Sequence, residues 1–332
     1  MSTTKFIHSL GVILTIFTIL TMSFHSTMDN RELEDSSILD DSNTSIDYFA
    51  LKNSNDWSSS ASAANPVVLT SVESSTNNEV VVAGIMSGST TMSLGSQSIT
   101  SSQNIEPWIA KADANGNWQW IQKVTVTGTS SYAEVDLADI SVAPNGDIFA
   151  TGRFYESISF GSISLTSTGY FDTWIAKLSS NGQWVWAEAL RGNGDYDGAV
   201  VTSIDWIQST SLTTDSNNAV TIGGFFLGNT DAGSSGDGIN GNQLDLNDAE
   251  IFVAKYSNSG FSEWIDDARG QGFQLVNSMV ADNSNNVWIS TTFEVSMTFG
   301  SVTANAGINE VPIGLAKISS SGIWQSAYAT SG

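Results

Sequence analysis

Short segments in which apolar and polar residues alternate fill the chain from about residue 65 to its end. The segment Phe171–Leu190 shows the pattern most clearly, with a strand-like run over Asp172–Leu178 and a turn at Ser179–Gly182. After this turn, Trp184 and Trp186 lie two residues apart, so a pleated strand presents both indoles on one face. The segment is therefore predicted to form an antiparallel hairpin.

The same hairpin pattern recurs three more times, and each copy contains an Ala-Lys pair. We call it the AK hairpin, and its lysines are Lys111, Lys177, Lys255 and Lys317. A first hairpin precedes each AK hairpin, with turns at Asn77-Asn78, Asn145-Gly146, Asn217-Asn218 and Asn285-Asn286. Asn and Gly tolerate the left-handed backbone that tight hairpin turns need, so these pairs are specific turn signals.

A shorter motif lies between the two hairpins in three of the four units, at residues 92–100, 158–166 and 297–305. It is expected to add a β-arm to four main strands. Antiparallel four-stranded repeats of this size predict an all-β fold, a β-propeller of about four blades, either an open arc or part of a larger propeller. The expected repeat region is 65–332, divided approximately into 65–128, 129–194, 195–270 and 271–332.

The first 23 residues are expected to be a signal peptide. Leu10–Met22 is apolar and uncharged, too short for a comfortable transmembrane span, and follows Lys5. Cleavage is expected after Ser23, and an uncleaved N-terminal anchor is the alternative, which would be the chain's only membrane contact. Both alternatives predict an extracellular or cell-surface protein. Residues 24–64 form an acidic Ser/Asn/Asp-rich linker, unless Phe49–Ala61 is a degenerate hairpin that begins the repeats.

Composition excludes several kinds of chemistry. The formal net charge is −23, so nucleic acids and anionic membrane surfaces are repelled. The chain has no cysteine, and its only histidines are His8 and His25, in or next to the leader. The repeat region therefore excludes Ser–His–Asp and Cys–His catalysis and most zinc, copper and haem ligation. No catalytic residue is assigned.

The spaced positions of the repeat resemble those of the secreted bacterial and archaeal β-propeller repeats known as SBBP repeats. The resemblance covers about residues 66–329 and rests in the second unit on Asn145, Gly146, Gly152, Asp172, Ala176, Lys177 and Gly182. It implies a β-propeller fold and an exported, often cell-surface, context. It implies no activity, because that family has no common catalytic residues.

One insertion has the composition of a metal site. The third unit lacks the arm motif and instead has a Gly- and Asn-rich stretch with four acids, Asp231, Asp237, Asp245 and Asp248. Hard oxygen ligands on a flexible loop suit calcium, although the spacing is not that of an EF-hand. The alternatives are a calcium site and a solvated loop, and no other cofactor is expected.

Two functions stay open. The favoured hypothesis is a non-enzymatic binding or adhesion scaffold whose partner is a glycan or a protein at the cell surface. The alternative is an extracellular carbohydrate-active enzyme that uses paired carboxylates, with candidates Asp195 with Asp197, Glu263 with Asp266, and Asp136 with Asp139. The repeated lysines are expected to pair a neighbouring blade's carboxylate, to bind an anion as a ring, or to be solvated. An open arc would also expose apolar faces and favour self-association.

Overall fold

A computed structural model describes residues 46–50, 57–63, 67–101, 105–129, 133–168, 171–192, 206–227, 230–231, 249–305 and 312–330. All of them belong to one compact unit, Asn43–Gly332. The predicted leader, residues 1–23, lies outside the described residues. The residues that the structure describes contain no helix, and therefore no helix that could cross a membrane.

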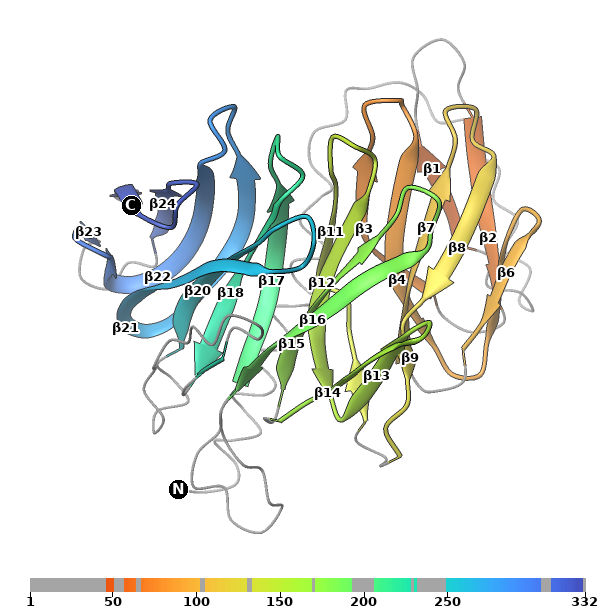
Figure 1. The fold of residues 1–332 in the computed structure, drawn as a ribbon, viewed down its shortest axis with the longest axis horizontal. Helices are drawn as coiled ribbons and strands as arrows, with labels where there is room; N and C mark the ends of the chain where they lie inside the picture. The colour runs from red at the N-terminus through yellow and green to blue at the C-terminus, as the bar shows by residue number, and fades with distance from the viewer. Residues whose placement is uncertain are drawn as a thin grey trace. The chain divides into compact units, whose positions relative to one another are not determined.

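Antiparallel sheets make up the described part of the chain, as the sequence predicts, and form four blades (Figure 1). The first blade has the order β3 (Val67–Ser74), β4 (Val80–Ser87), β7 (Ile105–Ala112) and β8 (Trp118–Lys123). The second consists of β11 (Asp139–Val142), β12 (Ile148–Tyr155), β15 (Asp172–Leu178) and β16 (Trp184–Gly192), with short additions at β10 (Glu134–Val135) and β19 (Thr230–Asp231).

The third and fourth blades share one long strand. The third comprises β17 (Trp206–Thr214), β18 (Val220–Leu227), β20 (Glu250–Tyr256) and the first part of β21 (Ser262–Ala281). The fourth comprises the end of β21, the start of β22 (Val287–Phe299), β24 (Ile313–Ile318) and β25 (Trp324–Ala329). Each blade therefore joins a first hairpin to an AK hairpin.

The arms are hairpins of short strands. They are β5 (Thr91–Leu94) with β6 (Gln97–Thr100), β13 (Ser157–Phe160) with β14 (Ile163–Thr166), and the end of β22 with β23 (Val302–Asn305). In the second blade the arm pairs with β9 (Thr125–Val126), the strand that leaves the first blade. The second blade's arm thus connects it to the first blade, and the fourth blade's arm connects it to the third, because residues 297–299 pair with residues 268–270 of β21.

The N-terminal hairpin of the unit occupies an equivalent place. β1 (Ile46–Ala50) pairs with β2 (Trp57–Ala63), and β2 pairs with the first arm through Ala63 and Met92. Val126 of β9 pairs with Ile158 of the second arm in the same way. Of the two interpretations of Phe49–Ala61, the hairpin is the one observed, and it takes the position of a preceding AK hairpin.

The first-hairpin turns adopt the expected backbone. Asn78, Gly146, Asn218 and Asn285 have φ values of 59°, 85°, 62° and 61°, in the left-handed region. In each turn this residue's N–H donates to the carbonyl three residues earlier. The turn residues therefore determine where each hairpin reverses.

The cores lie between blades. Three hydrophobic clusters each join the face of one blade to the next, for example Ile109 with Ile140 and Trp174, and Val253 with Met279. Each Val, Leu or Ile buried in this way stabilises the fold by about 1.5–3 kcal/mol. A further cluster combines the first blade with residues of its arm, including Met92 and Leu94. Packing between blades is therefore what holds the repeats together.

Candidate functional site

The first-hairpin turns of all four blades meet around one depression of about 280 Å³. We call the first strand of each blade, which is β3, β11, β17 or the end of β21, its innermost strand. The lining comes from the ends of these four strands and the turns that follow them: Ser74, Thr76, Val142, Ala143, Pro144, Thr214, Asp215, Ser216, Ala281, Asp282 and Asn283. Four of these residues carry a hydroxyl, one an amide and two a carboxylate, and the other four are apolar. Because four separate repeats contribute to one hollow, this end of the blades is the candidate functional site.

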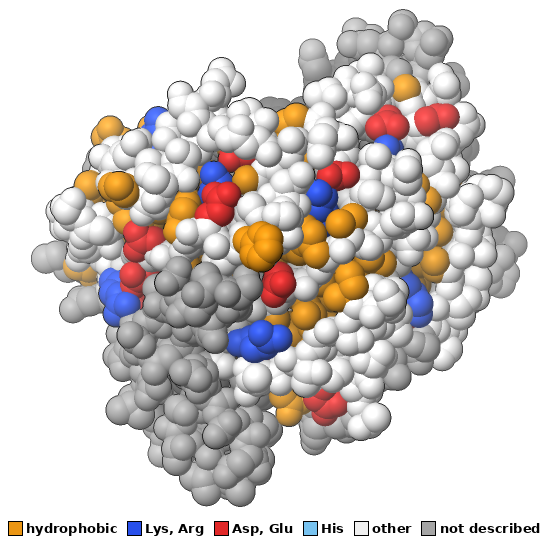
Figure 2. All heavy atoms as spheres, viewed as in Figure 1, with side chains coloured by type: hydrophobic (Ala, Val, Ile, Leu, Met, Phe, Trp, Pro, Cys, Tyr) orange, Lys and Arg blue, Asp and Glu red, His pale blue; other side chains and the backbone are white. Residues whose placement is uncertain are grey.

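The repeated lysines lie beside these turns, each in an ion pair with its own blade. Lys111 Nζ is 2.8 Å from Glu79 and Lys177 Nζ is 2.7 Å from Asp147. In the third and fourth blades the acid precedes the turn, where Lys255 pairs with Asp215 at 3.0 Å and Lys317 with Asp282 at 2.8 Å. Figure 2 shows several basic side chains beside acidic ones on one face. The expectation that each lysine pairs a neighbouring blade's carboxylate is therefore wrong, because the partner acid is in the same sheet.

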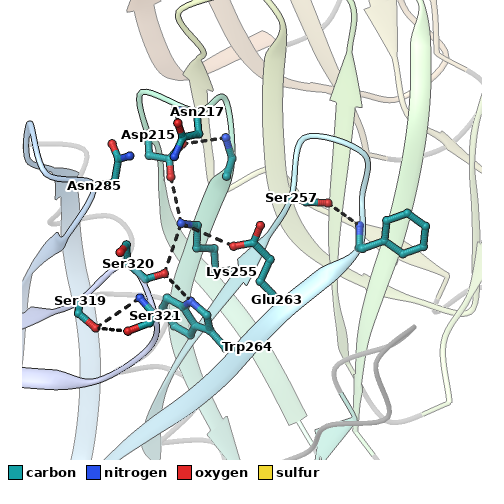
Figure 3. Close-up of polar contacts among 12 residues, drawn as sticks. Asp215, Asn217, Lys255, Ser257, Glu263, Trp264, Asn285, Ser319, Ser320 and Ser321 are labelled. Carbon is teal, nitrogen blue, oxygen red and sulfur yellow. Dashed lines mark hydrogen bonds and ion pairs between the residues drawn. The ribbon is translucent and has the colours of Figure 1, made fainter.

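The neighbouring blade supplies a carbonyl instead of a carboxylate. Lys255 and Trp264 both donate to the carbonyl of Ser320, in the AK turn of the fourth blade, at 3.5 and 3.0 Å (Figure 3). Lys177 and Trp186 share the carbonyl of Asn258 at 3.2 and 3.0 Å. The first junction is alike, because Lys111 and Trp120 both donate to Ser180, each at 3.2 Å.

This shared carbonyl explains why the AK hairpins are rich in tryptophan. The indole occupies the space between two blades while its N–H satisfies a turn carbonyl of the next blade. The lysine–tryptophan junction therefore ties the turn end of each blade to its neighbour and holds the depression in shape.

Asp139 lies on the innermost strand of the second blade and connects three blades. Its Oδ1 accepts from Ser71 Oγ at 3.0 Å, and its Oδ2 accepts from Ser211 Oγ and the Leu212 N–H at 3.2 and 3.1 Å. The position seven residues before the left-handed turn residue is Ser71, Asp139, Ser211 and Ser278 in the four repeats. An alignment of the four repeats could have identified Asp139, because the other three repeats have serine at this position.

Burial raises the pKa of Asp139 above its ordinary value of 3.8, against the hydrogen bonds that lower it. Burial also raises the pKa of Glu73 on the neighbouring strand, and the negative charge of Asp139 adds to that increase. A carboxyl whose pKa is higher in the folded state contributes stability below its ordinary pKa and loses it as pH rises through the raised value.

We therefore expect a pH-dependent difference in free energy of unfolding between the wild type and Asp139→Asn. The difference should move in favour of the wild type as the pH falls from about 7 to about 4, because only the wild type binds this proton. Urea unfolding at several pH values measures it. If the difference in free energy of unfolding does not change with pH, Asp139 does not have a raised pKa in the folded protein.

The structure does not bring together the predicted acid pairs that it describes. Asp136 Oδ2 is 2.8 Å from Arg153 Nε, whereas the carboxylate of Asp139 binds the serines described above. Glu263 is 3.6 Å from Lys255 Nζ, whereas Asp266 accepts from the Asp267 N–H. Each acid thus has its own partners, and the pair Asp195 and Asp197 lies outside the described residues.

Sequence reasoning missed a second cluster, around Arg153. Its guanidinium bonds Glu134 at 3.0 Å and Gln208 at 3.2 Å, and lies 4.5 Å from the centre of the Phe171 ring. Burial raises the pKa of Asp136 there, and Arg153 opposes the increase. Arg153 has no counterpart in the other first hairpins, so the repeat pattern contained no signal for it.

The calcium prediction falls almost wholly outside the described residues. Of its four acids only Asp231 is described, as part of β19, which pairs with β16. In the described part of the chain no group of three or more His, Asp or Glu residues could hold a metal ion.

If the insertion binds calcium, excess chelator should lower the melting temperature of the protein, because a ligand at one hundred times its Kd stabilises the folded state by about 2.7 kcal/mol. An unchanged melting temperature would contradict this prediction.

A second, larger depression, of about 370 Å³, lies at the arm of the second blade. It is lined by Thr127–Thr129, Tyr155–Ser157 and Thr166–Thr168. A single blade with its arm forms most of it, and its one carboxylate, Glu156, already accepts from the Thr129 N–H at 3.0 Å. The convergence of four repeats makes the first depression the better candidate.

No protein-family model matches the chain. An uncharacterized WD repeat-containing protein of Acanthamoeba polyphaga mimivirus is 27% identical over 224 residues, which cover 58% of this chain and 15% of that protein. This is a distant WD-repeat relative, and the chain spans only a small part of its length. The comparison assigns no molecular function.

Three solved structures are similar at low identity. A protein of unknown function from Bacteroides caccae has a TM-score of 0.28 and 10% identity, covering 79% of this chain and 86% of that chain. A catalytically inactive virginiamycin B lyase from Staphylococcus aureus has a TM-score of 0.24 and 12% identity, covering 77% and 95%. YCF48 from Cyanidioschyzon merolae has a TM-score of 0.23 and 14% identity, covering 70% and 82%. The fold assignment rests on the strand pairing described above.

Proposed function

We propose that this chain is a non-enzymatic binding or adhesion scaffold that acts outside the cytoplasm and holds a glycan or a protein of the cell surface at the turn end of its blades. The observation that carries the proposal is the convergence of four first-hairpin turns on one depression. The ligand would lie across loops that a rigid set of sheets positions, as binding sites on repeat folds commonly do.

The chemistry of the depression supports binding. Its hydroxyl groups come from Ser74, Thr76, Thr214 and Ser216, and its exposed amide from Asn283. Asp215 and Asp282, its two carboxylates, are paired with Lys255 and Lys317. A lining of hydroxyls, an amide and neutralised charges suits a polar, hydroxyl-rich ligand.

The proposed export rests on Leu10–Met22 and on the resemblance to SBBP repeats. A mature protein that begins near Phe24 and is found outside the cytoplasm is the expected result. N-terminal sequencing of the cell-surface and culture fractions measures it. Recovery of the intact N-terminus in a soluble cytoplasmic fraction would contradict the proposal.

The binding proposal is tested with a glycan array, and with binding to intact cells, for the wild type and Asn283→Trp. A bulky ring at this exposed position should fill the depression and weaken binding about tenfold or more, which corresponds to about 1.4 kcal/mol. Ser98→Trp, on the exposed side of the first arm, is the matched control and should bind like the wild type. Equal binding by the two variants would place the ligand elsewhere.

One observation favours an enzyme as the second candidate. Glu73 and Asp139 lie on neighbouring innermost strands, interact electrostatically, and both have raised pKa values. Acid–base hydrolysis of glycosides uses two neighbouring carboxyl groups, one as the acid and one as the base. Assays of the same preparation against a panel of glycoside substrates distinguish the enzyme from the scaffold. Turnover that Asp139→Asn abolishes would show that the protein is an enzyme.

A further inference from the structure

The outer face of the fourth blade exposes residues whose counterparts are buried in the other blades. The position two residues before the repeated lysine is occupied by Ile109, Ile175, Val253 and Leu315. The first three are fully buried, whereas Leu315 is 43% exposed. Two residues earlier, Ile251 is fully buried in the third blade, but Ile313 in the fourth is 59% exposed. In each earlier blade the following blade covers this face.

The fourth blade is also more apolar than its counterparts at two further positions on this face. The residue paired across β24 with Leu315 is Tyr328. Its counterparts in the earlier blades are Gln122, Glu188 and Asp266. Lys317 pairs with Trp288, which pairs in turn with Val280. At the position of Val280 the three earlier blades have Glu73, Ser141 and Thr213.

Both replacements oppose what a water-facing sheet surface requires. Tyr328 and Val280 are each 59% exposed. Terminal repeats that face water normally have a polar outer surface. We call the exposed set of Val280, Ile313, Leu315 and Tyr328 the terminal face, and its composition is that of an interface.

The terminal face also lacks the anchor for another blade of the same kind. The earlier blades dock on the next AK turn through Trp120, Trp186 and Trp264, nine residues after the lysine. Ser326 occupies that position in the fourth blade. Its small side chain leaves a flatter sheet, which favours packing of one sheet directly on another.

Charge on this face is compensated. Lys317 pairs with Asp282 at 2.8 Å and lies 5.0 Å from the centre of the Trp288 ring. Ser290 and Ser326, which lie opposite Leu315 and Lys317 in the sheet, carry hydroxyls. A two-fold axis brings the same surface of both copies together, so a neutral apolar surface meets its own copy without charge repulsion.

We propose that the terminal face is a self-association surface, through which two copies of this chain pack their fourth blades face to face about a two-fold axis. In Figure 1 the strands concerned, β22 and β24, lie near the C-terminus of the chain. The dimer would bury Leu315 and Tyr328 of each copy, as the following blade buries Ile109 and Ile175. It leaves the turn end of the blades to the ligand and does not depend on the proposed function.

Salt should strengthen this association. Two chains that each carry a net charge of −23 repel one another at a distance. The Debye length falls from about 30 Å at 0.01 M to about 8 Å at 0.15 M ionic strength, whereas contact between apolar faces persists. A dimer held instead by ion pairs would weaken as salt is added.

The test is sedimentation of the full chain at 0.15 M salt, with Leu315→Glu, Leu315→Lys and Phe261→Glu. The wild type and Phe261→Glu, a control at a 67% exposed turn residue of the third blade, should be dimers. Each Leu315 variant alone should be a monomer with wild-type circular dichroism. An equimolar mixture of the two should form dimers again, because we place Leu315 beside the two-fold axis, where the opposite charges of the two copies meet.

Three results would overturn the proposal. A wild type that remains monomeric at about 100 μM would show that the terminal face does not form the proposed dimer. A Leu315→Glu variant that remains dimeric would place the interface elsewhere. Failure of the mixed variants to associate would indicate a head-to-tail contact with the N-terminal hairpin or another surface.

Discussion

Replacing Lys255 by methionine should lower the free energy of unfolding by about 3–5 kcal/mol, the usual effect of removing one partner from a buried ion pair. The side chains of Lys255 and Asp215 are only 6% and 4% exposed. Methionine fills a similar volume, so the loss is mainly that of charge and of the hydrogen bond to Ser320. The carboxylate of Asp215 would be left buried without its cation.

Urea unfolding of the wild type, Lys255→Met and Lys317→Met measures this effect. Lys317→Met is the matched control, because that pair is 21% and 25% exposed and its removal should destabilise the protein much less. Adding Asp215→Asn to Lys255→Met should recover part of the loss. Equal losses for the two lysines would show that burial of the pair has no effect on stability.

Substituting alanine for Gly182 should also destabilise the protein strongly. Gly182 has a φ of 77°, and a Cβ atom there would lie 2.5 Å from the Trp120 ring. The left-handed backbone costs an L-residue about 1–2 kcal/mol. Forcing the packed indole aside costs a further 1–3 kcal/mol or so. The expected total is therefore about 2–5 kcal/mol.

Gly146→Ala separates the two contributions. Gly146 has a φ of 85°, but the nearest atom to its added Cβ would be 3.4 Å away. It should lose only the backbone part, about 1–2 kcal/mol. Thermal unfolding followed by tryptophan fluorescence measures both variants. A loss for Gly182→Ala no larger than that for Gly146→Ala would contradict the described contact with Trp120.

Local signals explain how much of the fold could be predicted. Asn-Asn and Asn-Gly pairs indicated the first-hairpin turns, and Asn78 and Gly146 have the left-handed backbone that this requires. Hairpins depend on neighbouring residues, so their signal is contained in a short stretch of sequence. The sequence does not decide whether the N-terminal hairpin exists, because its turn and periodicity signals are weak. Its pairing with the first arm is a contact between distant segments.

The candidate site was predicted less well. The repeat identifies the lysines, but the prediction that their acid partners lie in a neighbouring blade is wrong. The acid lies after the turn at Asp147 and before it at Asp215, so no fixed spacing identifies it. The interaction of Asp139 with Ser71 and Ser211 also joins different repeats. Cross-strand and cross-blade register, which decides such contacts, is not readable from one repeat alone.

The sequence by itself determined the repeat, its four strands with an arm, the turn positions, and the exclusion of histidine and cysteine chemistry. These follow from periodicity, turn propensity and composition, which are local properties. Only the tertiary structure decided which face of each blade is covered, which acid neutralises each lysine, and where four turns form one depression. Leu315 shows the reason. Its sequence context matches that of Ile109 and Ile175, yet it is exposed, because burial depends on whether another sheet packs against it.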